Sequence, residues 1–76
     1  MEFDPYLMKR ANSFELMKAA LANYAGFHDL WRNPHRFRPI GDLDNLYFEL
    51  EEKREVDETG FTNILAIGKA DVGFFR

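Results

Sequence analysis

A chain of 76 residues has room for one small domain, and its twelve aromatic residues suit a small core, since each buried ring removes on the order of 150–250 Å² from water. The absence of cysteine excludes a disulfide framework, thiol catalysis and cysteine-ligated zinc. The net charge of −3 is unevenly distributed, because residues 42–58 carry −6 and the rest carries +3. No apolar run approaches the ~20 residues that span a bilayer, and the N-terminal residues include acids where a signal peptide has bases, so we expect a cytoplasmic protein.

Residues 1–12 predict an N-terminal arm that packs on the domain through its aromatic side chains. Asp4 can cap a helix and Pro5 suits the first helical position, so a short helical turn is expected over residues 5–10. An arm that is only partly ordered is the alternative.

Residues 13–32 predict one long amphipathic helix, around which the domain is organised. Its apolar residues recur at helical spacing and share one face; they are Leu16, Met17, Ala20, Leu21, Tyr24, Phe27, His28 and Trp31. Asn12 or Ser13 can cap its start, and the Asn33-Pro34 pair ends it. Gly26 is expected to face solvent inside this helix. A helix that ends at Gly26 is the alternative, because glycine suits the residue just past a helix end.

Residues 33–44 predict a loop, since they contain two prolines and a glycine. This region is both basic and aromatic, with Arg32, Arg36 and Arg38 clustered around Phe37. Such a cluster can hold a phosphate backbone and stack a base, which predicts nucleic-acid binding as the alternative function of the chain. The other interpretation is that these arginines form ion pairs with the acidic segment of the same chain.

Residues 45–76 predict an antiparallel sheet. Residues 42–56 fit both a strand and a helix, and we favour a strand because the strands that follow need a partner. Residues 61–69 form the clearest strand, preceded by a turn at 57–60, where Gly60 is available for a positive φ, and followed by a last strand at 72–76. The predicted fold class is therefore α+β, with one long helix packed on a three-stranded antiparallel meander in two layers, in the order α-β-β-β.

No motif of known chemistry is present, so neither enzymatic activity nor a cofactor is expected. The sequence contains no GxSxG, P-loop or GxGxxG pattern, and Ser13 is better explained as a helix cap than as a nucleophile. His28, Asp29 and His35 do not converge on a metal ion at helical spacing, so no metal site is predicted. We expect instead a buried or half-buried His28 that donates to a backbone carbonyl.

These observations predict a small acidic protein-interaction domain, an adaptor, regulator or inhibitor that binds a macromolecular partner, expected to be a protein, through its sheet face or edge. A row of acids is expected to dock on a basic surface, such as one that handles nucleic acid; the row is Glu49, Glu51, Glu55, Asp57 and Glu58. Tyr47, Phe74 and Phe75 are expected to form an apolar surface that binds a partner or a second copy in a homodimer. No membrane contact is expected.

Overall fold

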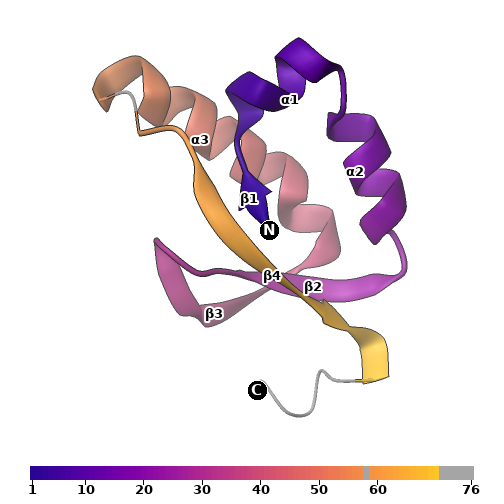
Figure 1. Cartoon of the computed structure of the whole chain (residues 1–76). Helices are drawn as coiled ribbons and strands as arrows, with labels where there is room; N and C mark the ends of the chain where they lie inside the picture. Colours follow the sequence, from indigo (N-terminus) through magenta and orange to yellow (C-terminus); the bar gives the residue numbers. More distant parts are fainter. Residues whose placement is uncertain (58, 71–76) are drawn as a thin grey trace.

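The computed structural model describes residues 1–57 and 59–70, which form an α+β domain of three helices and a four-stranded antiparallel sheet (Figure 1). The strands are β1 (Glu2–Phe3), β2 (Tyr24–Asp29), β3 (Asn33–Pro39) and β4 (Thr62–Gly68). The helices are α1 (Pro5–Ala11), α2 (Phe14–Leu21) and α3 (Leu43–Asp57), with a short 3₁₀ helix, η1 (Ile40–Asp42), before α3. The predicted α+β class is confirmed, whereas the predicted single long helix and three-stranded meander are wrong.

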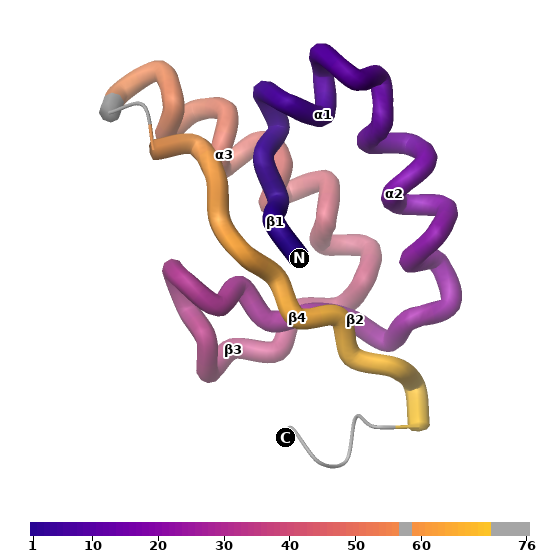
Figure 2. Tube along the Cα trace, in the orientation of Figure 1, coloured from indigo at the N-terminus to yellow at the C-terminus, as the bar shows by residue number. Residues whose placement is uncertain are grey.

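The strand order in the sheet is β1-β4-β2-β3, so strands from the two ends of the described chain lie side by side. β2 and β3 form a hairpin, and the chain then passes through α3 before β4 pairs with both β2 and β1 (Figure 2). β4 is therefore a central strand rather than part of a meander. The predicted strand over residues 61–69 is confirmed as β4, and the predicted strand over residues 72–76 lies outside the described residues.

The core lies between one face of the sheet and the helices. Strand residues Phe3, Phe27 and Ile64 cluster there with buried residues from all three helices, which are Met8, Leu21, Leu43, Leu46 and Leu50. Because successive residues of a strand point to opposite faces, His28 and Leu65 lie on the other side of the sheet. We call the side of Phe27 and Ile64 the inner face and the side of His28 and Leu65 the outer face.

The N-terminal segment is an integral part of the core rather than a partly ordered arm. Asp4 caps α1 by accepting a hydrogen bond from the backbone N–H of Tyr6 at 3.0 Å, and Pro5 opens the helix, as predicted. Phe3 is fully buried in β1. Asn12 is not the start of a helix; it ends α1 in the left-handed conformation (φ 52°), which asparagine tolerates better than most residues.

The long helix predicted over residues 13–32 is wrong because its second half is a strand. α2 ends at Leu21, and Tyr24–Asp29 form β2, which pairs with β3 on one side and β4 on the other. Phe27 fits the helical spacing, but an aromatic residue suits a central strand equally well, and the two neighbouring strands decide its conformation. Ser13 does occupy the N-cap position of α2, although its side chain makes no capping hydrogen bond.

Gly26 lies inside β2, where its lack of a side chain lets β3 approach. A Cβ atom at Gly26 would lie 2.1 Å from the backbone oxygen of Arg38 and 2.5 Å from the ring of Phe37. The Phe37 ring therefore reaches from β3 over β2, into space that any larger residue would fill. Neither predicted role of Gly26, a helix end or a solvent-facing helix position, applies.

The loop predicted over residues 33–44 is wrong because Asn33–Pro39 form β3, an edge strand that pairs with β2. Pro34 and Pro39 are compatible with this position, since a strand at the edge of a sheet has backbone groups on one side that need no ladder partner. The rest of this segment is η1 and the start of α3. The prolines indicate an edge strand here rather than a loop.

The strand favoured over residues 42–56 is also wrong, and the helical alternative is correct, since Leu43–Asp57 form α3. Leu43, Leu46 and Leu50 are buried at helical spacing against the sheet. β4 needs no partner from this segment, because β2 and β1 supply both of its neighbours. Gly60 follows α3 so closely that a Cβ there would lie 2.5 Å from the backbone oxygen of Leu50; close approach, not the predicted positive φ, explains this glycine.

Candidate functional site

Arg38 of β3 is a buried cation at the centre of an ion-pair network on the inner face of the sheet. Its side chain is 6% exposed, and its guanidinium lies over the ring of Phe27. Its Nε donates to Asp42 Oδ2 at 2.6 Å, and its Nη2 donates to Glu49 Oε2 at 2.8 Å. One arginine thus joins β3 to η1 and to α3.

Arg32, in the turn between β2 and β3, extends the network to β2. Its Nη2 donates to Glu49 Oε1 at 3.1 Å, and its backbone N–H donates to Asp29 Oδ1 at 3.2 Å. Asp29 is 2% exposed, and its carboxylate also accepts a hydrogen bond from the buried hydroxyl of Thr62. Opposite charges therefore alternate along the network, in the order Asp29, Arg32, Glu49, Arg38 and Asp42.

The network shifts the protonation equilibria of its members. Burial has the largest influence on Glu49 and raises its pKa, but the hydrogen bonds and charges of Arg38 and Arg32 outweigh it and hold that pKa below its ordinary value. The pKa of Asp42 is lowered as well, first by the hydrogen bond from Asn45 and then by the one from Arg38. Burial lowers the pKa of Arg38, yet its two carboxylate partners more than offset this and raise the pKa overall.

The contacts of Arg32 and Arg38 help to decide between the two interpretations of the arginines around Phe37, which are nucleic-acid binding and ion pairing with the acidic segment of the same chain. Arg32 and Arg38 form ion pairs with Glu49 of the acidic segment, as the second interpretation predicts. Arg36 is exposed and makes no ion pair within residues 1–57 and 59–70, while Phe37 lies on the outer face beside His28. The four residues predicted to bind nucleic acid therefore do not converge on one surface.

The predicted acidic row does not form a continuous line on α3. Glu49 faces β3, and Glu51 faces α1, so the two carboxylates point to different neighbours. Glu55 is exposed one turn beyond Glu51. Asp57 is the last residue of α3, and Glu58 lies outside the described residues.

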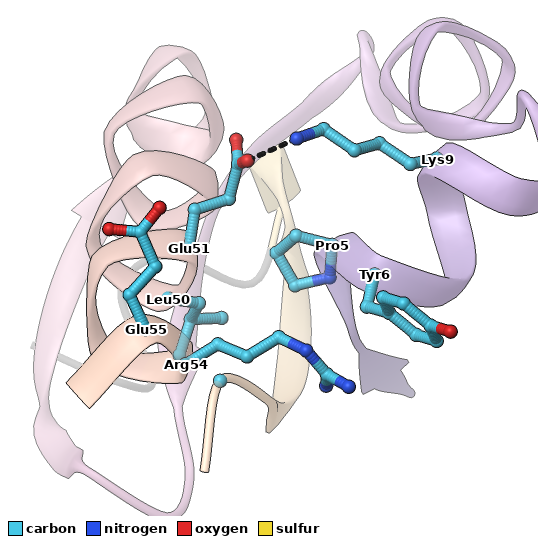
Figure 3. A pocket seen from close by; sticks show the side chains of 8 residues that line it. Pro5, Tyr6, Lys9, Leu50, Glu51, Arg54 and Glu55 are labelled. Carbon is cyan, nitrogen blue, oxygen red and sulfur yellow. Dashed lines mark hydrogen bonds and ion pairs between the residues drawn. The ribbon is translucent and has the colours of Figure 1, made fainter. Parts of the chain in front are cut away.

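A recess of about 190 Å³ lies between α1 and α3, and Glu51 is one of the residues that line it (Figure 3). Lys9 of α1 reaches across the rim of the recess and forms an ion pair with Glu51. On the other side the guanidinium of Arg54 lies over the ring of Tyr6, 4.0 Å from its centroid. Both contacts join α1 to α3, so we interpret the recess as part of a helix–helix contact.

The predicted apolar surface of Tyr47, Phe74 and Phe75 is not brought together by the described residues. Tyr47 lies on the helix side of the molecule, where its ring stacks on that of Phe14 with 4.3 Å between the centroids. This contact joins α3 to α2 and is packed against the core. Phe74 and Phe75 lie outside the described part of the chain.

His28 lies on the outer face, and its predicted role is confirmed. The residue is 5% exposed, and its Nδ1 donates to the backbone oxygen of Pro34 at 2.8 Å. Because a carbonyl oxygen only accepts hydrogen bonds, this contact places the proton on Nδ1. In the sheet His28 lies between Phe37 of β3 and Leu65 of β4, and the Phe37 ring meets the imidazole edge-on.

The outer face carries exposed apolar side chains at the end of the sheet nearer the turn between β2 and β3. Trp31, in this turn, is 59% exposed and contacts the ring of Phe61, which is 38% exposed, with 5.6 Å between centroids. Phe61 continues the alternation of β4 and so lies on the same face as Leu65, which is 44% exposed. We call Trp31, Phe61 and Leu65 the apolar patch.

Sequence reasoning missed the apolar patch because it placed Trp31 on the core face of a helix. One signal was available in residues 61–67, where both alternating sets of side chains are largely apolar. A strand with this composition buries one set against the helices and must present the other on the opposite face. Exposed apolar residues on the outer face of β4 were therefore predictable, although their contact with Trp31 was not.

The outer face also contains very few charged residues. The outward positions that the strand pairing assigns in β2, β3 and β4 hold no Lys, Arg, Asp or Glu; they are Gly26, His28, Phe37, Pro39, Asn63, Leu65 and Ile67. Glu2 of β1 is the one acid at an outward position of the described strands, at the opposite edge of the sheet from β3. This is a marked depletion, because 30% of the chain is charged.

Among the described residues, no three His, Asp or Glu side chains are placed to bind a metal ion together. No described helix combines the length and the hydropathy needed to cross a membrane. Comparison of the chain with protein-family models, with curated proteins and with solved structures finds no match in any of the three. Function is therefore inferred from the geometry of this chain alone.

Proposed function

We propose that the chain is a small protein-interaction domain without catalytic activity of its own, an adaptor, regulator or inhibitor that binds a macromolecular partner through the outer face of its sheet. The observation that supports this function is the apolar patch, in which Trp31 and Phe61 are in contact and both exposed. Single exposed apolar side chains are ordinary on protein surfaces, whereas a group of large ones points to an interaction site. Tryptophan is also enriched among the residues that dominate binding energy at protein interfaces.

We place binding on the face of the sheet rather than on its edges. The β3 edge contains Pro34 and Pro39, which have no backbone N–H, and the charged Arg36. Prolines and charges on an edge strand oppose the addition of a strand from another chain. The β1 edge offers a strand of two residues. Both edges are therefore poor templates for a partner strand, while the face offers the apolar patch.

The acidic row has less support as a binding surface, because the chain itself already uses part of it. Glu49 pairs with Arg38 and Arg32, and Glu51 pairs with Lys9. A carboxylate that is held in an internal ion pair must give up that partner before it can bind a basic surface. Docking of the acidic segment on a basic partner would therefore compete with the contacts that hold α3 in place.

Nucleic-acid binding through Arg32, Arg36, Phe37 and Arg38 is an alternative with less support. Arg32 and Arg38 pair with carboxylates, and the chain has a net charge of −3, whereas phosphate binding requires a basic surface. Light scattering of the chain mixed with generic nucleic acid at low salt separates the two functions. We expect no added mass, and added mass that disappears at high salt would favour the alternative.

Site-specific photocrosslinking tests the proposed function. A benzophenone amino acid is placed at Leu65 in the apolar patch, or at Leu16, which is 73% exposed on α2 and serves as the matched control. In the cells that make the chain, we expect a discrete adduct from position 65 and none from position 16. The adduct is expected to disappear when Trp31→Ser and Phe61→Ser are introduced together.

Two results would contradict this function. One is the same pattern of adducts from both positions, which would show that the outer face has no preference for a partner. The other is an adduct at position 65 that survives the double substitution. Circular dichroism of the double variant provides the folding control, because both substituted side chains are substantially exposed and their loss is expected to leave the secondary structure intact.

A further inference from the structure

We infer that the recess between α1 and α3 binds a small carboxylate that carries a short apolar chain. This site is separate from the apolar patch and goes beyond the proposed function. It is carried by an arginine at the recess that has no acidic partner, by the contacts that hold this arginine in place, and by the size and charge of the recess.

Arg54 of α3 is a half-buried cation whose guanidinium pairs with no carboxylate of residues 1–56. The buried Arg38, in contrast, has two acidic partners. Arg10 and Arg36 also lack an ion pair with these residues, but both are exposed to water. A guanidinium that has lost part of its water and has no acidic partner is well suited to bind a carboxylate from outside the chain, since the two groups match in shape and charge.

Two contacts hold Arg54 in place before any ligand binds. Its guanidinium lies over the ring of Tyr6, 4.0 Å from the centroid. Gly60 lies close to the other end of the side chain, because a Cβ at Gly60 would be 2.5 Å from the Cβ of Arg54. Stacking on an aromatic face leaves the edge of the guanidinium, which carries the N–H donors, open to a carboxylate. A donor that is already ordered loses less entropy on binding.

The recess limits the size of the ligand and favours an apolar chain. Its volume of about 190 Å³ is the space of roughly six water molecules. Pro5, Leu50 and Tyr6 line it together with Gly60, and Pro5 lies between Arg54 and the far rim (Figure 3). These residues favour a carboxylate with about four or five carbons over inorganic phosphate, which has no apolar part.

The charges around the recess favour a single negative charge on the ligand. Lys9 and Glu51 neutralise each other at one side. At the other side a second guanidinium, that of Arg10, also lies over the Tyr6 ring, 5.7 Å from its centroid. Glu55 lines the recess on the side away from Tyr6 (Figure 3). The two guanidiniums therefore exceed this one remaining carboxylate by one positive charge, which a monocarboxylate neutralises.

Titration of the isotope-labelled full chain with pentanoate, followed by nuclear magnetic resonance, tests the inference. We expect saturable shifts of amide signals from α1 and α3, with a dissociation constant of about 1 mM or below. The probe 1-pentanol has the same carbon chain without the carboxylate, and it is expected to cause no saturable shift of these signals.

Two variants locate the site. Arg54→Gln removes the guanidinium and keeps most of the stem, so it is expected to weaken pentanoate binding at least about tenfold. Arg36→Gln is the matched control, because it removes the same charge from an exposed arginine outside the recess, and its affinity is expected to stay within about twofold of the wild-type value.

A short peptide that ends in valine distinguishes two sources of the carboxylate. Tighter binding of this peptide than of pentanoate, lost when its C-terminus is amidated, would assign the site to the end of a protein chain. Tighter binding of pentanoate would assign it to a free acid. Both results support a carboxylate site.

Three results would overturn the inference. These are the absence of a saturable shift up to about 50 mM pentanoate, binding of 1-pentanol as tight as that of pentanoate, and an unchanged affinity in a folded Arg54→Gln variant. The first two use the wild-type chain, so they decide the inference even if the variant does not fold. None of them bears on the proposed function, because crosslinking from position 65 tests a different surface.

Discussion

The two faces of the sheet differ in which side chains they bury. Charged side chains are buried on the inner face, whereas large aromatic side chains are exposed on the outer face. On the inner face, Arg38 and Asp29 are charged but almost fully buried, and both find their partners within the chain. On the outer face, Trp31 and Phe61 are aromatic but substantially exposed. Arg38 resembles part of a binding surface in the sequence and yet joins elements of the domain, whereas Trp31 resembles a core residue in the sequence and is exposed. Residue type is therefore a weaker guide to function than the location of each residue's partners.

The largest expected effect on stability comes from Gly26→Ala, which disrupts the sheet that separates the two faces. Gly26→Ala would place a Cβ 2.1 Å from the backbone oxygen of Arg38, which cannot move without opening the hairpin. We expect a loss of about 3 kcal/mol or more in the free energy of unfolding, measured by urea denaturation.

Gly41→Ala is the matched control for this substitution, because a Cβ at Gly41 meets nothing within 4 Å. Its free energy of unfolding is expected to stay within about 1 kcal/mol of the wild-type value. Equal stability of Gly26→Ala and Gly41→Ala would contradict the close approach of β2 and β3.

The next effect tests whether the inner-face charges hold the domain together. Arg38→Met removes the hydrogen bonds to Asp42 and Glu49 and leaves both carboxylates without their buried cation. We expect a loss of roughly 2–4 kcal/mol in the free energy of unfolding. Arg36→Met is the control, since Arg36 is exposed, and its change is expected to stay within about 0.5 kcal/mol. Losses of similar size in both variants would mean that Arg38 has no special structural role.

The same network predicts a dependence of stability on pH. Glu49 and Asp42 have pKa values below their ordinary values in the folded protein, so their ionised forms stabilise the fold. This stabilisation is fully present above the ordinary values of 4.5 and 3.8 and is lost as the pH falls through the lower values of the folded state. The difference in unfolding free energy between wild type and Glu49→Gln is therefore expected to shrink from about pH 6 to about pH 3. A difference that stays constant over this range would rule out the ion pairs as its source.

The smallest expected effect on stability comes from the outer face. Trp31 is 59% exposed, so Trp31→Ser is expected to change the free energy of unfolding of the isolated domain by no more than about 1 kcal/mol. The measurement is made at low protein concentration, where association does not contribute to stability. A loss as large as that of Arg38→Met would show that Trp31 belongs to the core and not to an open face.

Local signals in the sequence predicted several parts of the fold correctly. The Asp4-Pro5 pair predicts the start of α1, and the β-branched and aromatic residues of segment 61–69 predict β4, because both depend on neighbours in the chain. The hydrogen bond from His28 to a backbone carbonyl was also expected, although on a different element.

The remaining elements depend on contacts that the sequence does not display. Tyr24–Asp29 continue the helical spacing of the preceding residues, and only pairing with β3 and β4 makes them a strand. Leu43–Asp57 fit both the helical and the strand period. The choice between helix and strand therefore depends on which other segments pair with the two sides of β4. The ion pairs of Arg32 and Arg38 with Glu49 follow from the same topology, because α3 and β3 come together only in the folded sheet.

Collisional quenching of Trp31 fluorescence by acrylamide tests the central claim, that the apolar patch is exposed in the single domain and available to a partner. Trp31 is the one tryptophan of the chain, so the signal reports on the apolar patch alone. At high dilution the quenching constant is expected to be at least about half that of the urea-unfolded chain. A Trp31 that is shielded from acrylamide at every concentration in a chain of monomer mass would contradict the account, because something within the domain would already cover the patch.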